Sequence, residues 1–305
     1  MNELSPQNDQ WSIPAPDMQP SALTEPGMKQ LEADFGAVSI VKYIRDVEYA
    51  RPDGKPLYLQ LLLPSVLGET EKRPMVVFVR GSAWQKQSVA AGIPQLVELA
   101  RHGFIVASAE YRPAPDAHFP AQPDDIWAAV RFLCAHAGEM KLDTDRIAVW
   151  GSSSGAHTAL LMAMLPRYQA EHVKLRAVVD YYGPSYLPAM IGYHESSTAH
   201  LDALLGVPVL ENPDLAKQAS PACYAGQPGI PPVLILHGDK DKSCSFEQSV
   251  ILYRELRLAN ADVTMYRMHN AAHGGSPFWT PQVLELVENF LRSRLGAGAE
   301  QAGDR

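Results

Sequence analysis

Cysteine is scarce in this sequence, and its positions argue against two common kinds of stabilisation. The 305 residues include three cysteines, Cys134, Cys223 and Cys244, and no pair has C-x-x-C spacing. An odd, dispersed set argues against a disulfide framework and against a zinc site built from thiolates. The sequence also lacks an H-E-x-x-H motif, so we expect neither a metal nor another cofactor.

Long apolar runs and basic clusters are missing as well. Runs such as residues 233–236 have the length of a strand, whereas a membrane span needs roughly 20 apolar residues, so no membrane partner is expected. The chain carries 26 basic and 34 acidic residues, a net charge of −8, which disfavours nucleic acid as a partner. Residues 1–10 lack the basic and apolar regions of a secretory signal, and together with the sparse cysteines this indicates a cytoplasmic protein.

The remaining composition suits one catalytic domain with two irregular ends. Hydrophobic residues make up 46% of the chain, enough for one sizeable core. Residues 1–35 are rich in proline and predict an extended arm, which either wraps the domain, contacts a second subunit in a homo-oligomer, or is disordered. Residues 36–296 are the predicted catalytic domain, and the Gly/Ala-rich residues 297–305 are a predicted frayed tail.

Strand patterns alternate with helix patterns over most of the domain. This order predicts an α/β fold with a mostly parallel central sheet covered by helices on both faces. Residues 183–229 interrupt the alternation with six prolines and predict a small lid-like insertion. The expected strands are residues 41–49, 57–63, 75–80, 104–109, 147–150, 177–181, 233–236 and 263–266, and the expected helices are residues 93–102, 124–137, 248–260 and 281–294.

Gly151-Ser152-Ser153-Ser154-Gly155 is the most informative motif in the chain. It lies between a predicted strand and a small-residue helical segment, as does the G-x-S-x-G nucleophile elbow of α/β-hydrolases. Small residues at both outer positions allow the sharp turn that exposes the central side chain. The pattern therefore predicts Ser153 as a nucleophile at the N-terminus of a helix.

A serine nucleophile needs a histidine base and a carboxylate that orients it, and both follow in the expected chain order. After the strand at 233–236 come Asp239 and Asp241, of which we favour Asp241 because Asp239 directly follows a glycine and suits a turn. After the next strand come His269 and His273. We favour His273, since its small neighbours allow it to reach the serine.

An oxyanion hole completes this kind of site, because N–H groups must stabilise the charge that develops on the reacting carbonyl oxygen. One donor is expected to be the backbone N–H of Ser154, the residue after the nucleophile. The other is expected from the loop Gly81-Ser82-Ala83-Trp84, which follows the predicted strand at 75–80.

Taken together, these motifs resemble the esterase/lipase branch of the α/β-hydrolases. The similarity is greatest to the hormone-sensitive-lipase-like enzymes and to bifunctional acetylxylan/feruloyl esterases, and it covers roughly residues 40–295. It implies Ser153, Asp241 and His273 as the triad and the backbone of Ser82, Ala83 and Ser154 as the oxyanion hole. It rests on Gly81-Ser82-Ala83-Trp84, Glu110-Tyr111-Arg112, Phe119-Pro120-Ala121-Gln122-Pro123-Asp124-Asp125, the elbow, Ala219-Ser220-Pro221, His237-Gly238-Asp239-Lys240-Asp241 and Ala271-Ala272-His273-Gly274-Gly275.

One loop departs from the pattern of the family, which usually reads His-Gly-Gly-Gly-Trp where this chain has Arg80-Gly81-Ser82-Ala83-Trp84. The loss of two glycines predicts that backbone angles open only to glycine are absent here, and that side chains narrow the acyl side of the site. Arg80 is expected to form a buried ion pair. Candidate substrate-binding aromatics are Trp84, Tyr182, Tyr193, Phe278 and Trp279. Core packing is the favoured role for any one of them, and Phe278 and Trp279 are the strongest candidates because they directly follow the loop of His273.

The sequence therefore predicts a serine hydrolase that acts on a small-molecule ester without a cofactor. Short-acyl or hydroxycinnamoyl esters, including those of carbohydrates, are the expected substrates. The same triad also serves amidases, peptidases and arylformamidases, and these alternatives stay open. A non-catalytic hydrolase-like binding protein is disfavoured because no member of the triad is missing.

Overall fold

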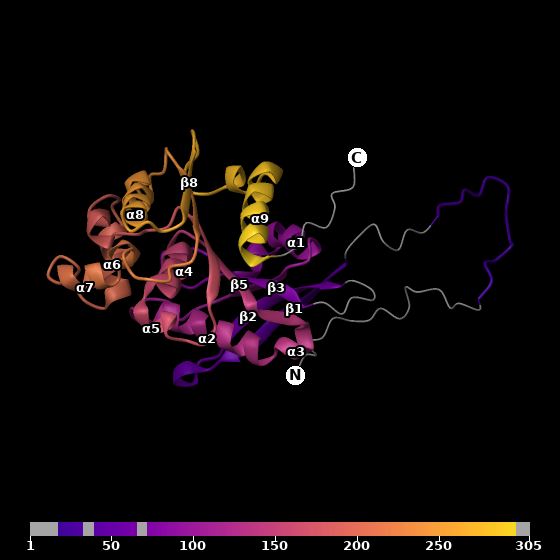
Figure 1. Cartoon of the computed structure of the whole chain (residues 1–305), viewed down its shortest axis with the longest axis horizontal. Helices are drawn as coiled ribbons and strands as arrows, with labels where there is room; N and C mark the ends of the chain where they lie inside the picture. The colour runs from indigo at the N-terminus through magenta and orange to yellow at the C-terminus, as the bar shows by residue number, and fades with distance from the viewer. Residues whose placement is uncertain (1–17, 33–39, 66–71, 297–305) are drawn as a thin grey trace.

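The predicted strands assemble into one eight-stranded sheet in the order β1-β2-β4-β3-β5-β6-β7-β8. Only β2 opposes its neighbours among the described strands, so the sheet is mostly parallel, as expected. The strands are β1 Ile40–Ala50, β2 Leu57–Ser65, β3 Arg73–Val79, β4 Ile105–Ala109, β5 Leu142–Ser152, β6 Leu175–Tyr181, β7 Val233–Gly238 and β8 Val263–Met268 (Figure 1).

The computed structural model describes residues 18–32, 40–65 and 72–296. Residues 18–32, the described part of the predicted arm, are exposed and contain no helix or strand. The rest of that arm and the predicted tail at 297–305 lie outside the described residues. The contact between subunits through the arm stays a prediction. Among the described residues, no helix is both long and apolar enough to cross a membrane.

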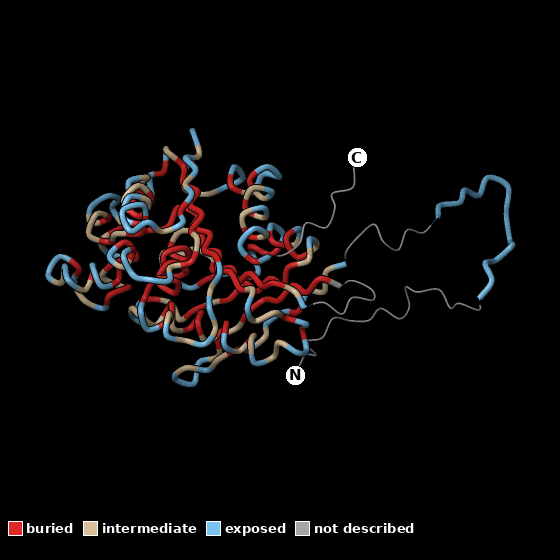
Figure 2. Tube along the Cα trace, viewed as in Figure 1, coloured by how far each residue is buried: buried red, intermediate tan, exposed pale blue. Residues whose placement is uncertain are grey.

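Helices cover both faces of the sheet because its strands are apolar on both sides. In β3, Met75, Val77 and Val79 contribute to one buried cluster, whereas Val76 and Phe78 contribute to the other. The first face packs against α2 Ala121–Ala135, α4 Ser154–Met164 and α8 Phe246–Leu258, and the second against α1 Ile93–Arg101 and α9 Pro281–Leu295. Figure 2 shows the buried residues concentrated along the strands between these helices.

The predicted insertion at 183–229 contains two short helices, α6 Ser197–Leu205 and α7 Pro213–Gln218. Two 3-10 turns accompany them, η3 Leu187–Met190 and η4 Pro221–Tyr224. The insertion has a small apolar cluster that also includes Trp84, from the loop after β3. This packing connects the insertion to the loop in which an oxyanion hole is expected.

The elbow between β5 and α4 depends on unusually close backbone contacts. A Cβ atom on Gly155 would lie 2.0 Å from the carbonyl oxygen of Val79, and one on Gly151 would lie 2.4 Å from the amide nitrogen of Ala156. Between them, Ser153 has φ 53° and ψ −127°, a strained conformation for a residue with a side chain. The glycines therefore let α4 begin against the end of β3 and fix the outward direction of Ser153.

Gly155→Ala tests this contact. The added methyl group would overlap main-chain atoms of β3, so we expect the free energy of unfolding to fall by at least about 2 kcal/mol. Chemical denaturation measures the change. Gly138→Ala is the matched control, because its Cβ would enter open space. If both variants unfold at the same denaturant concentration, α4 does not approach β3 as closely as described here.

Candidate active site

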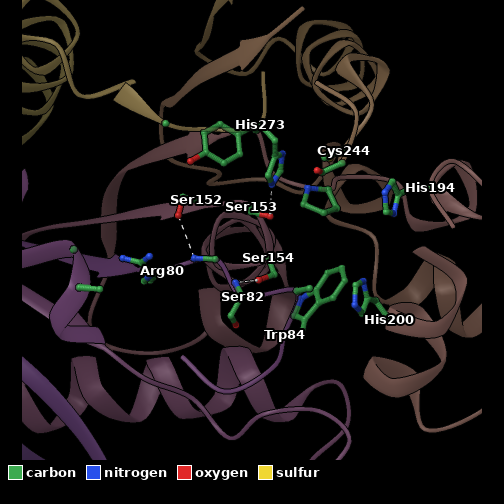
Figure 3. A pocket seen from close by; sticks show the side chains of 18 of the residues that line it. Arg80, Ser82, Trp84, Ser152, Ser153, Ser154, His194, His200, Cys244 and His273 are labelled. Carbon is green, nitrogen blue, oxygen red and sulfur yellow. Dashed lines mark hydrogen bonds between the residues drawn. The ribbon is translucent and has the colours of Figure 1, made fainter. Parts of the chain in front are cut away.

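A cavity of about 920 Å³ opens beside the elbow, at the carboxyl ends of β3 and β5. Its walls come from the loop after β3, the elbow, the insertion and the loop before α9. Small-molecule sites in proteins enclose roughly 300–1,000 Å³, so the cavity can hold a substrate of that class. Figure 3 shows Ser153 at the centre of this cavity, with His273 directly beside it.

Ser153, His273 and Asp241 form a continuous hydrogen-bonded chain. The Oγ atom of Ser153 lies 2.9 Å from Nε2 of His273, and Nδ1 of His273 lies 2.6 Å from Oδ2 of Asp241. The carboxylate can only accept, so Nδ1 carries a proton and Nε2 is left free to accept the serine proton. The arrangement can therefore activate the Ser153 hydroxyl.

Asp241 is held as a buried carboxylate. Burial alone would raise the pKa of its carboxyl group, but hydrogen bonds from His237 and His273 hold that pKa well below its usual value. The backbone N–H groups of Ser243 and Cys244 also donate to Oδ1, at 2.8 and 2.9 Å. Asp241 therefore stays ionised and can stabilise a positive charge on His273.

Asp239 and His269, the competing candidates, form a separate cluster. Asp239 accepts hydrogen bonds from Nε of Arg267 at 2.8 Å, from Nδ1 of His269 at 2.7 Å and from the backbone N–H of Asn270 at 2.7 Å. The side chain of His269 is 74% exposed. The structure thus places this pair at a loop that supports the strand ends, and neither residue contacts Ser153.

His237 is a buried residue that contacts the carboxylate of Asp241. It belongs to one of the sequence motifs, but no role was predicted for it. Its Nε2 lies 3.1 Å from Oδ2 of Asp241 and 3.0 Å from the carbonyl oxygen of Cys244. Both of these atoms are acceptors, so Nε2 is the donor, and Nδ1 faces the hydroxyl of Ser249 at 2.7 Å. His237 consequently helps to fix the position of the carboxylate through Oδ2, the oxygen that also contacts His273. A histidine directly before Gly238 was the available signal.

Two of the three predicted oxyanion donors are free to bind a substrate oxygen. Ser154 is the first residue of α4, so its N–H has no acceptor within the helix. The N–H of Ala83 has no acceptor among the described residues. The N–H of Ser82, in contrast, donates to Oγ of Ser154 at 2.9 Å. The N–H groups of Ala83 and Ser154 are therefore the two that remain free for a substrate oxygen, whereas the N–H of Ser82 is occupied within the loop.

The loop reaches left-handed backbone angles even though it lacks the two glycines. Ala83 has φ 52° and Trp84 has φ 60°. The expectation that such angles would be avoided is wrong, because residues with a Cβ can enter the left-handed region at a cost of about 1–2 kcal/mol. The hydroxyl of Ser82 supports the turn by donating to the carbonyl of Gln85 at 2.6 Å.

Trp84 holds the loop through a buried histidine that sequence reasoning missed. Its indole N–H donates to Nδ1 of His157 at 3.1 Å, and Nε2 of His157 donates to the carbonyl of Ala219 at 2.7 Å. Burial lowers the pKa of His157 to about 4, so the imidazole is neutral and has this one tautomer. Trp84 is only 2% exposed but also lines the cavity, so it positions the loop, and its predicted contact with substrate stays a prediction.

The other predicted aromatic residues divide between the cavity and the core. Tyr182 and Trp279 line the cavity, and the ring of Tyr182 lies 4.7 Å from that of His273. Phe278 is fully buried against Tyr182, which removes it from the predicted substrate contacts. Tyr193 is 43% exposed and donates its hydroxyl to the carbonyl of Asp241 at 2.7 Å.

Comparisons with known proteins agree with this fold. The sheet order and the elbow define an α/β-hydrolase. The BD-FAE family model matches residues 59–256, so the chain belongs to that family, and the predicted resemblance to the esterase/lipase branch is confirmed.

Among the described residues, no three His, Cys, Asp or Glu side chains are grouped to hold a metal ion.

Individual relatives show the extent of the similarity. Esterase LipQ of Mycobacterium tuberculosis is 27% identical over 259 residues, which are 81% of this chain and 61% of LipQ, so the chain spans about three fifths of that relative. A carbohydrate esterase from gut microbiota superposes with a TM-score of 0.70 and 24% identity, over 84% of this chain and 96% of its own. The propionate-bound esterase Est2 of Thermogutta terrifontis gives 0.69 and 24%, over 88% of this chain and 98% of its own.

Asp241→Asn and Asp239→Asn separate the two carboxylates. The amide at Asp241 would favour the wrong tautomer of His273, and we expect kcat to fall by about four orders of magnitude. Asp239→Asn weakens contacts within an exposed loop and should leave kcat nearly unchanged. Steady-state kinetics on an activated ester measures both. An exchange of the two phenotypes would assign the orienting carboxylate to Asp239.

The buried carboxyl group of Asp180 is expected to make the free energy of unfolding depend on pH. Burial raises the pKa of its carboxyl group to about 7, although the N–H of Gly183 donates to Oδ1 at 2.8 Å. Since the folded-state pKa is raised, the protonated acid stabilises the fold, and this contribution is lost as pH rises from the unfolded value of about 4 through 7. Asp180→Asn should remove that loss, which is on the order of a few kcal/mol.

Urea denaturation below and above this pH range measures the effect. The wild-type protein should lose more of its free energy of unfolding between the two conditions than Asp180→Asn does. Asp214→Asn serves as the control, because its side chain is 87% exposed and should leave the pH dependence unaltered. Identical pH profiles for wild type and Asp180→Asn would show that Asp180 does not titrate in this range.

Proposed function

We propose that this protein is a serine-dependent carboxylic-ester hydrolase. The observation that carries the proposal is the hydrogen-bonded chain from Ser153 through His273 to Asp241, which opens onto a cavity of substrate size. Membership of the BD-FAE family and similarity to esterases such as LipQ support it.

The geometry supports a two-step acyl transfer. His273 takes the proton of Ser153 as Oγ attacks the ester carbonyl, and Asp241 stabilises the resulting imidazolium. The N–H groups of Ala83 and Ser154 hold the oxyanion. His273 then protonates the leaving alcohol, and water attacks the acyl-enzyme in the same way to regenerate Ser153.

Short-acyl or hydroxycinnamoyl esters are the substrates that we propose. The side chains of Ser82 and Ala83 line the cavity where the related loop carries glycines, and they occupy space beside Ser153. The three cysteines are free, which supports the further proposal that the protein works in a reducing, cytoplasmic environment.

Ser153→Ala tests the reaction and its nucleophile. We expect kcat to fall by about four to six orders of magnitude, because the remaining groups can only bind and polarise the substrate. Circular dichroism should show an unchanged fold. Ser276→Ala is the matched control, since Ser276 lines the same cavity but does not contact His273.

The same assay distinguishes the rival activities of this triad. The wild-type protein should hydrolyse phenyl acetate with a higher kcat/KM than acetanilide or formanilide. Preference for formanilide would indicate an arylformamidase, and preference for acetanilide an amidase. Absence of turnover on every substrate would support a non-catalytic role and contradict the proposal.

A further inference from the structure

Arg80 gives the cavity an unbalanced positive charge. Of the cavity-lining residues that the structure describes, Arg80 is the one arginine or lysine, and none is an aspartate or glutamate. This contrasts with the chain as a whole, whose net charge is −8. Asp241, the acidic group of the candidate triad, lies behind His273 and is engaged by it, so Arg80 is the charged group of the cavity wall itself.

The Arg80 guanidinium lacks the ion pair that was expected for it. Within the described part of the chain, it forms no ion pair and donates no hydrogen bond, and only its main-chain carbonyl accepts one, from the side chain of Gln87. The residue is half-buried. A guanidinium in that environment gains most from a planar anion such as a carboxylate, which it can bind through two parallel hydrogen bonds.

Arg80 lines the cavity together with Gly92 and Gln95, so an anion in the cavity can approach it. A Cβ on Gly92, which also lines the cavity, would be 3.9 Å from Nη1 of Arg80 and 3.4 Å from the ring of Phe78. Gly92 therefore lies beside Nη1 without a side chain that would cover it. Gln95, the exposed neighbour on α1, adds an amide that can donate a further hydrogen bond.

Arg80 also lies close enough to Ser153 in space to contact a substrate bound there, because its neighbour in the chain packs against Ser153. The next residue, Gly81, approaches the nucleophile so closely that a Cβ there would lie 2.6 Å from Cβ of Ser153. Figure 3 shows Ser153 between Arg80 on one side and the insertion residues His194 and His200 on the other. One part of a bound ester can therefore point toward Arg80 while its carbonyl lies at Ser153.

We propose that Arg80 forms a subsite for a carboxylate carried by the ester substrate. This inference rests on the proposed ester hydrolysis and narrows its substrates to anionic esters, such as hemiesters of dicarboxylic acids. The carboxylate belongs either to the acyl part or to the alcohol part of the ester. The chemistry that recognises it is the same in both cases.

Two pairs of substrates distinguish these sources. p-Nitrophenyl hemiglutarate and p-nitrophenyl pentanoate share a chain length but differ by a carboxylate on the acyl part. p-Carboxyphenyl butyrate and p-tolyl butyrate differ in the same way on the alcohol part. For each ester pair, the quantity compared is kcat/KM of the charged ester divided by kcat/KM of the neutral ester. For one of the two pairs, we expect this ratio to fall about ten- to hundredfold in Arg80→Met, because the variant loses a charge-assisted hydrogen bond.

Matched variants control for general effects of charge and folding. Arg80→Lys should retain part of the ratio, because it keeps the charge but loses the bidentate geometry. Arg101→Met removes a positive charge from the exposed surface of α1 and should keep the wild-type ratio. Glutarate should also inhibit the wild-type enzyme competitively, whereas pentane-diol should not, and this measurement needs no variant.

The outcomes separate this inference from the proposed function. Ser153-dependent hydrolysis of the neutral esters, with charged-to-neutral ratios that Arg80→Met leaves unchanged and no inhibition by glutarate, would overturn the carboxylate subsite and leave the esterase proposal standing. No turnover of any ester would overturn both.

Discussion

The contact of α4 with the end of β3 is the constraint on which the active-site geometry depends. No side chain fits between Gly155 and the carbonyl of Val79, so the N-terminus of α4 lies directly beside the loop that follows β3. The N–H of Ser82, in that loop, consequently reaches Oγ of Ser154, next to the strained backbone of Ser153. One packing contact therefore brings together the two segments that carry the candidate nucleophile and the candidate oxyanion donors.

Buried histidines connect this centre to the segments around it. His157 joins the loop at Trp84 to the insertion at Ala219, and its low pKa keeps it neutral and its tautomer constant. His237 holds the carboxylate of Asp241 through Oδ2, the oxygen that also contacts His273. Each histidine satisfies polar groups that would otherwise be buried without partners, which is the physical reason that these parts of the site are rigid.

Sequence patterns predicted the fold and the candidate triad because both depend on local signals. Apolar runs located the strands, and the small residues around Ser153 located the elbow. Asp241 was favoured because Asp239 directly follows a glycine and suits a turn, and the structure pairs Asp241 with His273. Element ends were less accurate: α2 begins at Ala121, and β5 begins at Leu142, several residues before the apolar run that predicted it.

Features that depend on pairing between distant residues could not be predicted in this way. The N–H of Ser82 is occupied by a hydroxyl 72 residues later in the chain. Phe278 enters the core through Tyr181 and Tyr182, which its position next to the catalytic loop did not reveal. Arg80 was expected to have an acidic partner, but no local pattern shows whether one lies within reach. These outcomes follow from tertiary packing, which a linear motif does not encode.

The central claim is that Ser153 is the reactive nucleophile of an esterase. Mass spectrometry of the protein after reaction with an alkyl fluorophosphonate tests it most directly, because the reagent forms a stable covalent adduct with an activated serine. We predict one adduct per chain, located by peptide fragmentation at Ser153. An adduct at Ser152 or Ser154 would contradict the account. So would a protein that acquires no adduct from the reagent and still hydrolyses esters at the full rate.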